Sequence, residues 1–384
     1  MYFISKHSFI FILINITIFA CTKERGTTGY LEKIGHVELP LPPGNDSYSY
    51  TVKYYHNNDG QYLFWHNNFN HSILVYDLEK KEIAKIMRFE REGPEKLYKI
   101  QGFTVLSADS VYLATELAGK LYLVNGNGKI VQQLIFADTE DLRNANNYTS
   151  MNSKYTNDLY RIHSDSFLIP LKTPFMPGSS AQSGDEVYSI FRVVNTRNQT
   201  YRNTGLQAPK ALFVAGKNPL PFLHCSTYDG EKLYYSFESD HNIYYSADFK
   251  TATAIEAASM YKTKFQPLNP NMTPYEYYAR IFFYSHLIYD PYRNLFYRVV
   301  KLPIREDHQS NDEYRTEYEY PPRFSIMILD KNGRTLHEQL FEDTGLNMYI
   351  MFVGKQGLYI SASSPANPAF DEQALLFDIY AYNP

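Results

Sequence analysis

The 384-residue sequence is poor in cysteine and contains only Cys21 and Cys225. Two cysteines allow at most one disulfide, and none if Cys21 carries a lipid, so the core must stabilise the fold. No Cys-x-x-Cys pair or Cys/His ligand spacing is present, which disfavours a zinc site. Cys225 ends the apolar segment Phe222-Leu223-His224-Cys225 and is predicted to be a small buried residue rather than a nucleophile.

The motifs of common enzyme classes are also missing. The sequence has no His-Glu-x-x-His, no Gly-x-Ser-x-Gly, no phosphate-binding glycine loop and no calcium-loop pattern. Residues 330–333 offer oxygen ligands, but a hairpin turn of this kind needs no metal. His56, His66 and His71 lie near one loop, and solvated loop histidines are a simpler interpretation than a metal site. We therefore expect no metal and no cofactor.

The charge balance disfavours a further class of partner. Lys and Arg number 37, Asp and Glu 41, and the resulting formal net charge of −4 is spread over mixed signs along the chain. Because nucleic-acid binding needs a basic face, we expect no nucleic-acid partner. The abundant residues are Tyr, with 36, and Phe, with 25. Aromatic side chains suit the half-buried surfaces of β-sheets.

The N-terminus carries an apolar run. Lys6 and His7 precede apolar residues 9–20, a run shorter than the about 20 residues of a membrane-spanning helix. The run ends at Ile18-Phe19-Ala20-Cys21, which resembles the bacterial lipoprotein cleavage and lipidation box. We predict a signal peptide and lipobox over residues 1–21 with Cys21 acylated, a tether over 22–33, and one domain over 34–384. An ordinary secretory peptide is the alternative.

Repeated units follow one another along the rest of the chain. In five of them a short turn separates two strands rich in aromatic and β-branched residues, and the turns contain Asp59, Asp109, Asp165, Asp229 and Asp290. A sixth turn is Lys355-Gln356-Gly357. The Asp turns are 50 to 64 residues apart, more than the about 40 to 50 residues of common propeller repeats, so each unit is interpreted as a four-stranded blade with loop insertions.

The last unit is incomplete. It ends at Pro384 after its third strand, and an open strand edge invites aggregation. Residues 34–41 form a strand-like segment ahead of the first blade, and we predict that this segment completes the last blade and closes the ring. The predicted fold class is therefore all-β, a six-bladed β-propeller. A seventh blade would require another unit within residues 148–156.

The junction between the first two units indicates a family. Arg91-Glu92-Gly93-Pro94, followed by Gly102-Phe103 and Asp109-Ser110-Val111-Tyr112-Leu113, resembles a junction of bacterial lipoprotein propellers. With the lipobox, the mature chain resembles the uncharacterised family called domain of unknown function 4221, related to TolB-like and NHL-like six-bladed propellers. Glu95-Lys96-Leu97 departs from the small residues usual there. The resemblance implies a fold and supplies no catalytic residues.

Loop lengths distinguish the two faces of the predicted ring. Connections alternate between the two ends of each blade, so the short Asp turns and the polar hairpins share one face. The other face receives the long segments, at residues 66–71, 90–100, 137–156, 173–186, 259–280, 305–323 and 363–373. Long loops without secondary structure of their own are often functional. Binding is therefore expected on this face, around the mouth of the central channel.

These long segments are rich in aromatic residues and arginine. Such side chains suit flat polar ligands or protein partners. The alternative is that the tyrosines pack the loops onto the blades. The candidate binding residues are Tyr148, Tyr275, Tyr277, Tyr278, Tyr314, Tyr318, Tyr320 and Arg323, with Tyr155, Phe175, Arg280 and Arg315 nearby.

Three functions remain open at this point. The leading one is a cell-envelope lipoprotein that binds a protein partner or a glycan through the loop-rich face, without chemistry of its own. The second is a polysaccharide lyase or hydrolase, because His163, His224 and His286 on inner strands could converge at the channel with Arg280. The third is a structural envelope scaffold.

The predicted location is the bacterial cell envelope, as an outer-membrane lipoprotein facing the periplasm or the cell surface. Acyl chains, not a helix, would hold the protein on the membrane. We expect Cys21→Ser to release the protein into the soluble fraction, as measured by fractionation and immunoblotting. A mutant protein that stays wholly in the membrane fraction would rule out this anchor.

Overall fold

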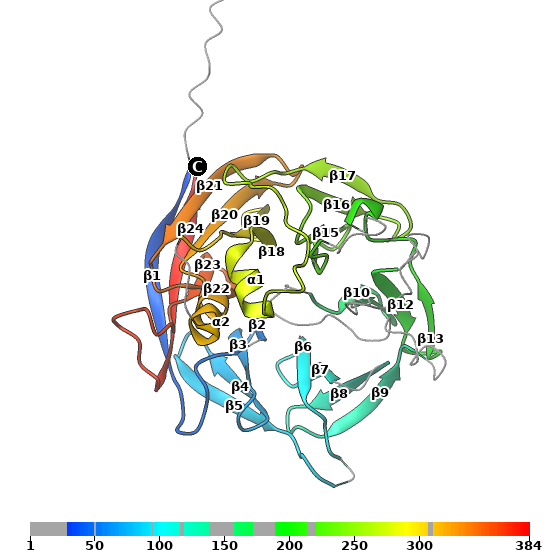
Figure 1. Cartoon of the computed structure of the whole chain (residues 1–384). Helices are drawn as coiled ribbons and strands as arrows, with labels where there is room; N and C mark the ends of the chain where they lie inside the picture. Colours follow the sequence, from blue (N-terminus) through cyan, green and yellow to red (C-terminus); the bar gives the residue numbers. More distant parts are fainter. Residues whose placement is uncertain are drawn as a thin grey trace, which may run out of the picture.

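The chain folds into a ring of six four-stranded antiparallel sheets (Figure 1). The computed structural model describes residues 29–49, 51–93, 95–115, 119–137, 157–171, 189–212, 220–305 and 310–384. Within these residues the six sheets are the blades of a β-propeller, which confirms the predicted fold class and blade number. Cys21 and residues 148–156, where a seventh blade was considered, lie outside the described residues.

Each blade has four strands, and the first strand of each blade lies next to the central channel. From the innermost strand to the outermost, blade 1 consists of β2 (Val52–Asn57), β3 (Gly60–Asn67), β4 (Ser72–Asp77) and β5 (Glu82–Arg88), and blade 2 of β6 (Ile100–Ser107), β7 (Ser110–Thr115), β8 (Lys120–Asn125) and β9 (Ile130–Ile135). Blade 3 consists of β10 (Tyr160–His163), β11 (Ser166–Pro170), β12 (Phe191–Asn195) and β13 (Thr200–Asn203), and blade 4 of β14 (His224–Tyr228), β15 (Leu233–Phe237), β16 (Asn242–Ser246) and β17 (Thr253–Glu256). Blade 5 consists of β18 (Phe283–Asp290), β19 (Leu295–Lys301), β20 (Arg323–Asp330) and β21 (Thr335–Glu342), and blade 6 of β22 (Asn347–Val353), β23 (Leu358–Ser361), β24 (Ala374–Asn383) and the N-terminal strand β1 (Tyr30–Pro40).

Short polar side chains form the repeated turns. Asp229 accepts hydrogen bonds at Oδ1 from the backbone N–H groups of Glu231 and Lys232, at 2.8 and 2.7 Å. Asp290 does the same for the two residues that follow Pro291. In blade 1 the acceptor is Asn57, whose Oδ1 receives the N–H of Asp59 at 2.9 Å. The turns therefore depend on a side-chain acceptor before the bend, which explains the repeated Asp and Asn.

The N-terminal strand closes the ring, as predicted. β1 pairs antiparallel with β24 from Tyr30 opposite Asn383 to Pro40 opposite Ala374. The strand begins at Tyr30 and not at residue 34, so the predicted tether is too long by the residues from Tyr30 to Lys33. The reason is a contact with blade 5: the Leu31 N–H donates to Gln339 Oε1 at 2.7 Å, and the Leu31 side chain is buried.

Hydrophobic cores lie between neighbouring blades. Each of the six buried clusters draws its residues from two adjacent blades. Every junction contains an aromatic pair, with ring centroids 4.5 to 6.4 Å apart, within the range of favourable ring contacts. The pairs are Phe64–Phe103, Tyr112–Phe167, Phe191–Tyr235, Tyr234–Phe296, Phe341–Tyr380 and Trp65–Phe377. The high Tyr and Phe content thus serves the ring.

One buried cation joins blades 4 and 5. Arg298 on β19 is fully buried, and its guanidinium lies 3.4 Å from the ring centroid of Tyr284. It donates to the carbonyl oxygens of Asp240 and Ala257, both at 2.6 Å, and to Ser236 Oγ at 2.6 Å. A buried charge is costly unless it is paired or well hydrogen-bonded. The hydrogen-bond acceptors of blade 4 stabilise the buried charge of Arg298.

Two of the long segments contain helices, which the sequence interpretation missed. α1 (Pro274–Arg280) begins after Thr273, whose side chain accepts the Glu276 N–H. α2 (Asn311–Glu319) begins after Ser310 with a full capping box that involves Glu313. Ser-x-x-Glu and Thr-Pro are helix-start signals present in the sequence. The expectation that residues 259–280 and 305–323 lack secondary structure is therefore wrong.

The closure makes a prediction about stability. We expect deletion of residues 30–40 to destabilise the whole domain, because β24 then loses its partner. Two point substitutions on β1 separate the contribution of side-chain packing from that of strand pairing. Leu39→Ala empties a fully buried site and should cost about 2 to 4 kcal/mol in urea unfolding. Ile34→Ala, on the same strand but half-exposed, should cost less than about 0.5 kcal/mol. If the deletion variant and the intact protein had the same urea unfolding midpoint, β1 would not be needed to close the ring.

Candidate functional site

The blade topology gives the molecule two unlike faces. Turns between first and second strands, and between third and fourth strands, lie on one face, which we call the turn face. The connections between second and third strands and between blades lie on the other, which we call the loop face. α1 and α2 belong to blade-to-blade or second-to-third connections, and Figure 1 shows them in front of blades 5 and 6. The loop face therefore carries those predicted binding residues that the structure describes.

The structure brings four of the predicted tyrosines together between α1 and α2. Ring centroids of Tyr318 lie 5.6 Å from Tyr275 and 5.7 Å from Tyr278, and Tyr277 lies 5.3 Å from Tyr278. Tyr318 also lies 6.2 Å from Tyr349 on the inner strand β22. This cluster joins the two helices to blade 6.

Two tyrosines of these helices, Tyr277 and Tyr314, are core residues and not surface contacts. Tyr277 is buried and its hydroxyl donates to the Gln266 carbonyl at 2.7 Å. Tyr314 is buried, and Arg280 donates to its hydroxyl at 2.5 Å. Burial raises the pKa of Tyr278 well above its ordinary value. For Tyr277 and Tyr314 the structure therefore agrees with the alternative that these tyrosines pack the connections onto the blades.

The other predicted binding residues have separate partners. Tyr320 packs edge to face on Tyr48, at 5.6 Å between centroids. Arg323 pairs with Glu342, with Nε and Oε1 2.8 Å apart, and this bond lowers the pKa of Glu342. Arg315 is exposed and lies 5.9 Å from the Tyr275 ring. Tyr148, Tyr155 and Phe175 lie outside the described residues.

A buried lysine anchors α1. Lys301 on β19 is fully buried, and its ammonium donates to the carbonyl oxygens of Ala279 and, at 3.4 Å, Ile281. These carbonyls lie at the C-terminal end of α1, where the helix leaves acceptors without intrahelical partners. Burial lowers the pKa of Lys301 to about 7. α1 is thus tied to blade 5 and offers a fixed surface.

The candidate catalytic residues lie in different surroundings. His224 is buried between Phe191 and Phe237, with ring centroids 5.2 and 6.1 Å away, and burial lowers its pKa to about 3. His286 is also buried; its Nδ1 lies 2.6 Å from Ser285 Oγ. Arg280 pairs with Glu276 at 3.2 Å. Neither histidine is exposed to a ligand in this arrangement.

Metal-ligand candidates do not gather either. No group of three His, Cys, Asp or Glu side chains suited to a metal occurs among the described residues. His66 is buried on the loop face, and burial, with His71 nearby, lowers its pKa to about 3. His56 lies at the opposite, turn end of β2 and contacts Tyr292. Cys225 is buried with its pKa raised to about 12, as expected for a core residue.

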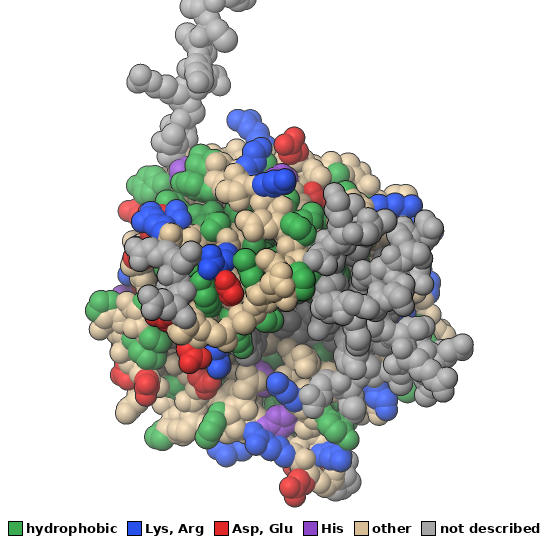
Figure 2. Space-filling model, viewed as in Figure 1, with side chains coloured by type: hydrophobic (Ala, Val, Ile, Leu, Met, Phe, Trp, Pro, Cys, Tyr) green, Lys and Arg blue, Asp and Glu red, His purple; other side chains and the backbone are tan. Residues whose placement is uncertain are grey.

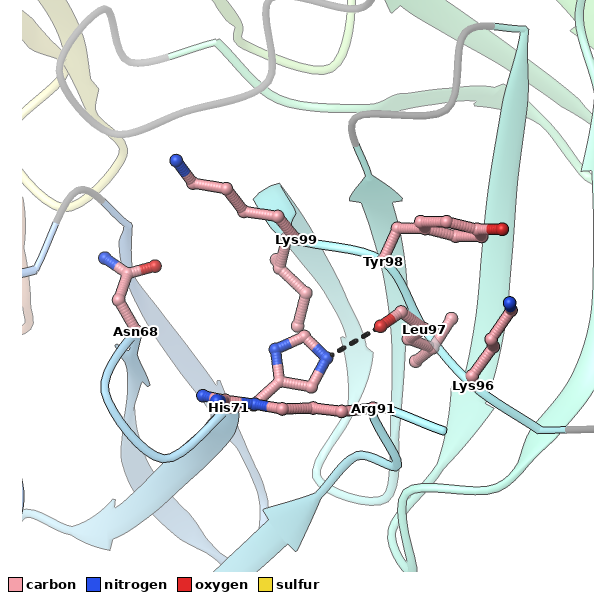
Figure 3. Close-up of a pocket in the computed structure, with 8 residues that line it drawn as sticks. Asn68, His71, Arg91, Lys96, Leu97, Tyr98 and Lys99 are labelled. Atoms are coloured by element: carbon pink, nitrogen blue, oxygen red, sulfur yellow. Dashed lines mark hydrogen bonds between the residues drawn. The ribbon is translucent and has the colours of Figure 1, made fainter. Parts of the chain in front are cut away.

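A basic pocket lies on the loop face at the junction of blades 1 and 2 (Figure 3). Its volume is about 400 Å³, and its polar lining residues are Asn68, His71, Arg91, Lys96, Tyr98 and Lys99. None of the lining side chains is acidic. We call it the basic pocket. In Figure 3, Asn68, Lys99 and the His71–Arg91 pair face one open space from three sides.

Local contacts hold the pocket in shape. His71 has a left-handed backbone with φ of 53° and is buried against Phe89, 5.8 Å between ring centroids. Its Nε2–H donates to the Leu97 carbonyl at 3.0 Å, which leaves Nδ1 as an acceptor. Arg91 donates to the Phe69 carbonyl at 2.6 Å. These bonds tie the connection after β5 to the loop after β3.

The sequence interpretation missed this pocket. Arg91, Lys96 and Lys99 were available as three cations within nine residues of one long connection. His71 and Asn68 come from another loop, and their approach depends on the fold of blade 1. Glu90, Glu92 and Glu95 lie on the same connection, so the sequence shows no local excess of basic residues that would have pointed to the pocket.

Apolar side chains are exposed on the same face. Phe69 and Met260 are 72% and 69% exposed, the highest values among the large hydrophobic side chains of the described residues, and Tyr98 is 38% exposed. All three lie on loop-face connections. Figure 2 shows Lys and Arg side chains gathered on the lower part of this face, over blades 1 and 2. The loop face therefore combines exposed apolar residues with cations.

Comparisons with known proteins agree with the fold. The family model described as Domain of unknown function (DUF4221) matches residues 43–340. A crystal structure of a member of that family from Bacteroides vulgatus has a TM-score of 0.79 and 20% identity, covering 94% of this chain and 99% of that one. No curated protein matches the sequence.

A second solved structure is more distant. It is a Bacteroides fragilis protein provisionally named as exported, with a TM-score of 0.55 and 12% identity, covering 94% of this chain and 97% of that one. At these identities the likeness concerns the fold alone.

The buried histidines predict how stability depends on pH. The folded-state pKa values of His66 and His224 are about 3, below the ordinary 6.5, so protonation favours the unfolded chain. Their contribution is complete above pH 6.5 and is lost as the pH falls toward 3, by up to about 1.4 kcal/mol per pH unit for each histidine. His224→Phe should reduce the loss between about pH 7 and 5 by about 2 kcal/mol in urea unfolding.

The control for this prediction is His163→Gln, since His163 is exposed and its replacement should leave the pH dependence unchanged. An unchanged pH dependence in His224→Phe would show that His224 is already protonated or accessible in the folded protein.

Proposed function

We propose that this chain, which belongs to the family Domain of unknown function (DUF4221), is an exported envelope protein that binds a protein partner through its loop face, without chemistry of its own. Export is supported by the signal-like N-terminus and by the name of the Bacteroides fragilis relative. Lipid attachment at Cys21 and an outer-membrane location complete the proposal. Among the described residues, neither helix is long and apolar enough to cross a bilayer.

The observation that carries the proposal is the neighbourhood of Phe69 and Tyr98. Tyr98 lines the basic pocket together with Arg91, Lys96 and Lys99, and the exposed Phe69 follows the lining residue Asn68 in the chain. Protein interfaces are enriched in aromatic residues and arginine, and a few such residues supply most of the binding energy. The proposed partner presents an acidic side chain to the basic pocket and an apolar side chain to Phe69.

Charge and geometry support an acidic partner group. Arg91 donates one hydrogen bond to the Phe69 carbonyl. Because a guanidinium has five N–H donors, other donors of Arg91 can bind an acidic group. Lys96 lies 5.2 Å from the Tyr98 ring centroid, which holds its charge beside the aromatic ring. A carboxylate placed here would receive charge-assisted hydrogen bonds. Because the cations are exposed, binding should weaken as salt is added.

A second contact area on the same face is the edge of the α1–α2 pair. Arg315 on α2 is exposed, and Tyr275 and Tyr318, whose rings are 5.6 Å apart, are half-buried beside it. Lys301 fixes α1 against blade 5, so this edge needs little ordering when it binds. Preorganised contacts lose less entropy on association.

The enzyme alternative has weaker support. It depends on His224 and His286, and both are buried. A general base must come within hydrogen-bond reach of its substrate proton. The glycan alternative for the loop face also has weaker support, because Phe69 and Met260, the most exposed of the large hydrophobic side chains that the structure describes, suit a protein surface better.

The test is capture from envelope extracts by mature protein that lacks residues 1–20, with matched variants on the two faces. Tyr98→Ala and Lys99→Glu should each lower recovery of the partner about tenfold, the effect of about 1.4 kcal/mol. Tyr292→Ala and Lys331→Glu, on the turn face, should leave recovery unchanged. Tyr292 is a close match because it is 37% exposed and Tyr98 is 38% exposed.

Each outcome decides between the faces. A partner whose capture is reduced by the loop-face variants and by added salt supports the proposal. A partner lost with the turn-face variants, or captured equally by all four variants, contradicts it. Unfolding midpoints of the four variants should match wild type, because all four side chains are exposed.

A further inference from the structure

A second pocket opens on the turn face, at the mouth of the central channel. Its volume is about 330 Å³, within the range of about 300 to 1,000 Å³ found for ligand pockets. Inner strands of blades 1, 3, 4, 5 and 6 contribute to its lining, which includes Lys53, Tyr54, His56, Asp158 and Tyr292. We call it the channel pocket. Its position on the axis differs from that of the basic pocket, which lies on the other face.

Aromatic rings form the outer rim of the channel pocket. Tyr292, in the Asp turn of blade 5, has its hydroxyl 3.0 Å from His56 Nδ1, and the two ring centroids are 5.7 Å apart. Tyr54 stacks between His56, at 6.1 Å and 25°, and Phe352, at 5.8 Å and 12°. This stack fixes the rings before a ligand arrives, and Tyr292 keeps 37% of its surface exposed.

An ion pair lies deeper in the same pocket. Lys53 Nζ is 2.9 Å from Asp158 Oδ2, with side chains 11% and 30% exposed. Thr104 donates to the other oxygen of Asp158. Lys53 precedes His56 by three residues on β2, so the pair lies about 10 Å from the rim. The pocket thus offers a donor and an acceptor side by side, and the two charges cancel.

Apolar side chains complete the wall between the rim and the ion pair. Leu287 and Ile288 come from β18, and Met351, Phe352 and Val353 from β22. A wall of this kind disfavours a ligand that carries net charge, because burying an unpaired charge is costly. It suits a ligand with one apolar face and several hydroxyl groups.

We propose that the channel pocket binds a neutral sugar residue. The apolar face of the sugar ring packs against the Tyr292 and His56 rings, and its hydroxyl groups reach Asp158 as acceptor and Lys53 as donor. Neighbouring hydroxyls can use both partners of an ion pair, because each hydroxyl donates one hydrogen bond and accepts others. The volume suits one or two sugar rings.

This site is independent of the proposed partner surface. It opens on the turn face, which was expected to take no part in binding, and it uses none of the residues of the basic pocket. A partner on the loop face and a sugar in the channel pocket could be bound by one molecule at the same time. Either proposal can therefore fail without the other.

The test uses neutral methyl glycosides of common hexoses and N-acetylhexosamines as probes, with binding to mature protein followed by saturation-transfer NMR and calorimetry. At least one glycoside should bind, and Tyr292→Ala should weaken it about tenfold, as expected for loss of one ring contact. Tyr292→Phe keeps the ring and removes only the hydroxyl next to His56, so it should retain most of the affinity.

The control is Tyr98→Ala, which removes an equally exposed tyrosine from the loop face and should leave glycoside binding unchanged. Failure of every glycoside to bind would overturn the proposal. So would binding that Tyr292→Ala leaves unchanged, or binding that Tyr98→Ala abolishes. Glucuronate serves as a charged comparison, and tighter binding of glucuronate than of the neutral glycosides would contradict the requirement for a neutral ligand.

Discussion

The pairing of β1 with β24 is the constraint on which the rest of the structure depends. A propeller blade buries its faces only against its two neighbours, and each of the six cores here is shared by two adjacent blades. An open ring would therefore leave one face of blade 1 and one face of blade 6 without a partner. Closure joins residues about 340 positions apart in sequence, so it ties both ends of the domain to one sheet.

The alternating connections within the blades give the two faces of the ring different properties. Short turns built on Asp and Asn acceptors make one face compact. Insertions accumulate on the other face, where a connection can lengthen without disturbing a hairpin. The proposed partner surface and the proposed sugar site follow this division: the first uses long connections and exposed cations, and the second uses inner strands that meet at the axis.

The sequence predicted what local patterns determine. Turn residues and alternating aromatic strands were enough for six blades, and the missing fourth strand of blade 6 was enough to place β1. Contacts distant in sequence were not predictable. Gln339 extends β1 back to Tyr30, the Gln266 carbonyl accepts a hydrogen bond from the Tyr277 hydroxyl, and Arg280 donates one to the Tyr314 hydroxyl. The basic pocket joins two connections, and the channel pocket joins five blades, so neither can be inferred from one segment. The helix-start patterns at Thr273 and Ser310 are present in the sequence and would have predicted both helices.

The central claim is that the loop face, and not the turn face, meets a protein partner in the cell envelope. The most direct measurement is photo-crosslinking in living cells, with a photoreactive amino acid placed at Phe69 in one strain and at Lys331, on the turn face, in another. The account predicts a discrete protein adduct from position 69 and none from position 331. An adduct from position 331 alone would contradict it.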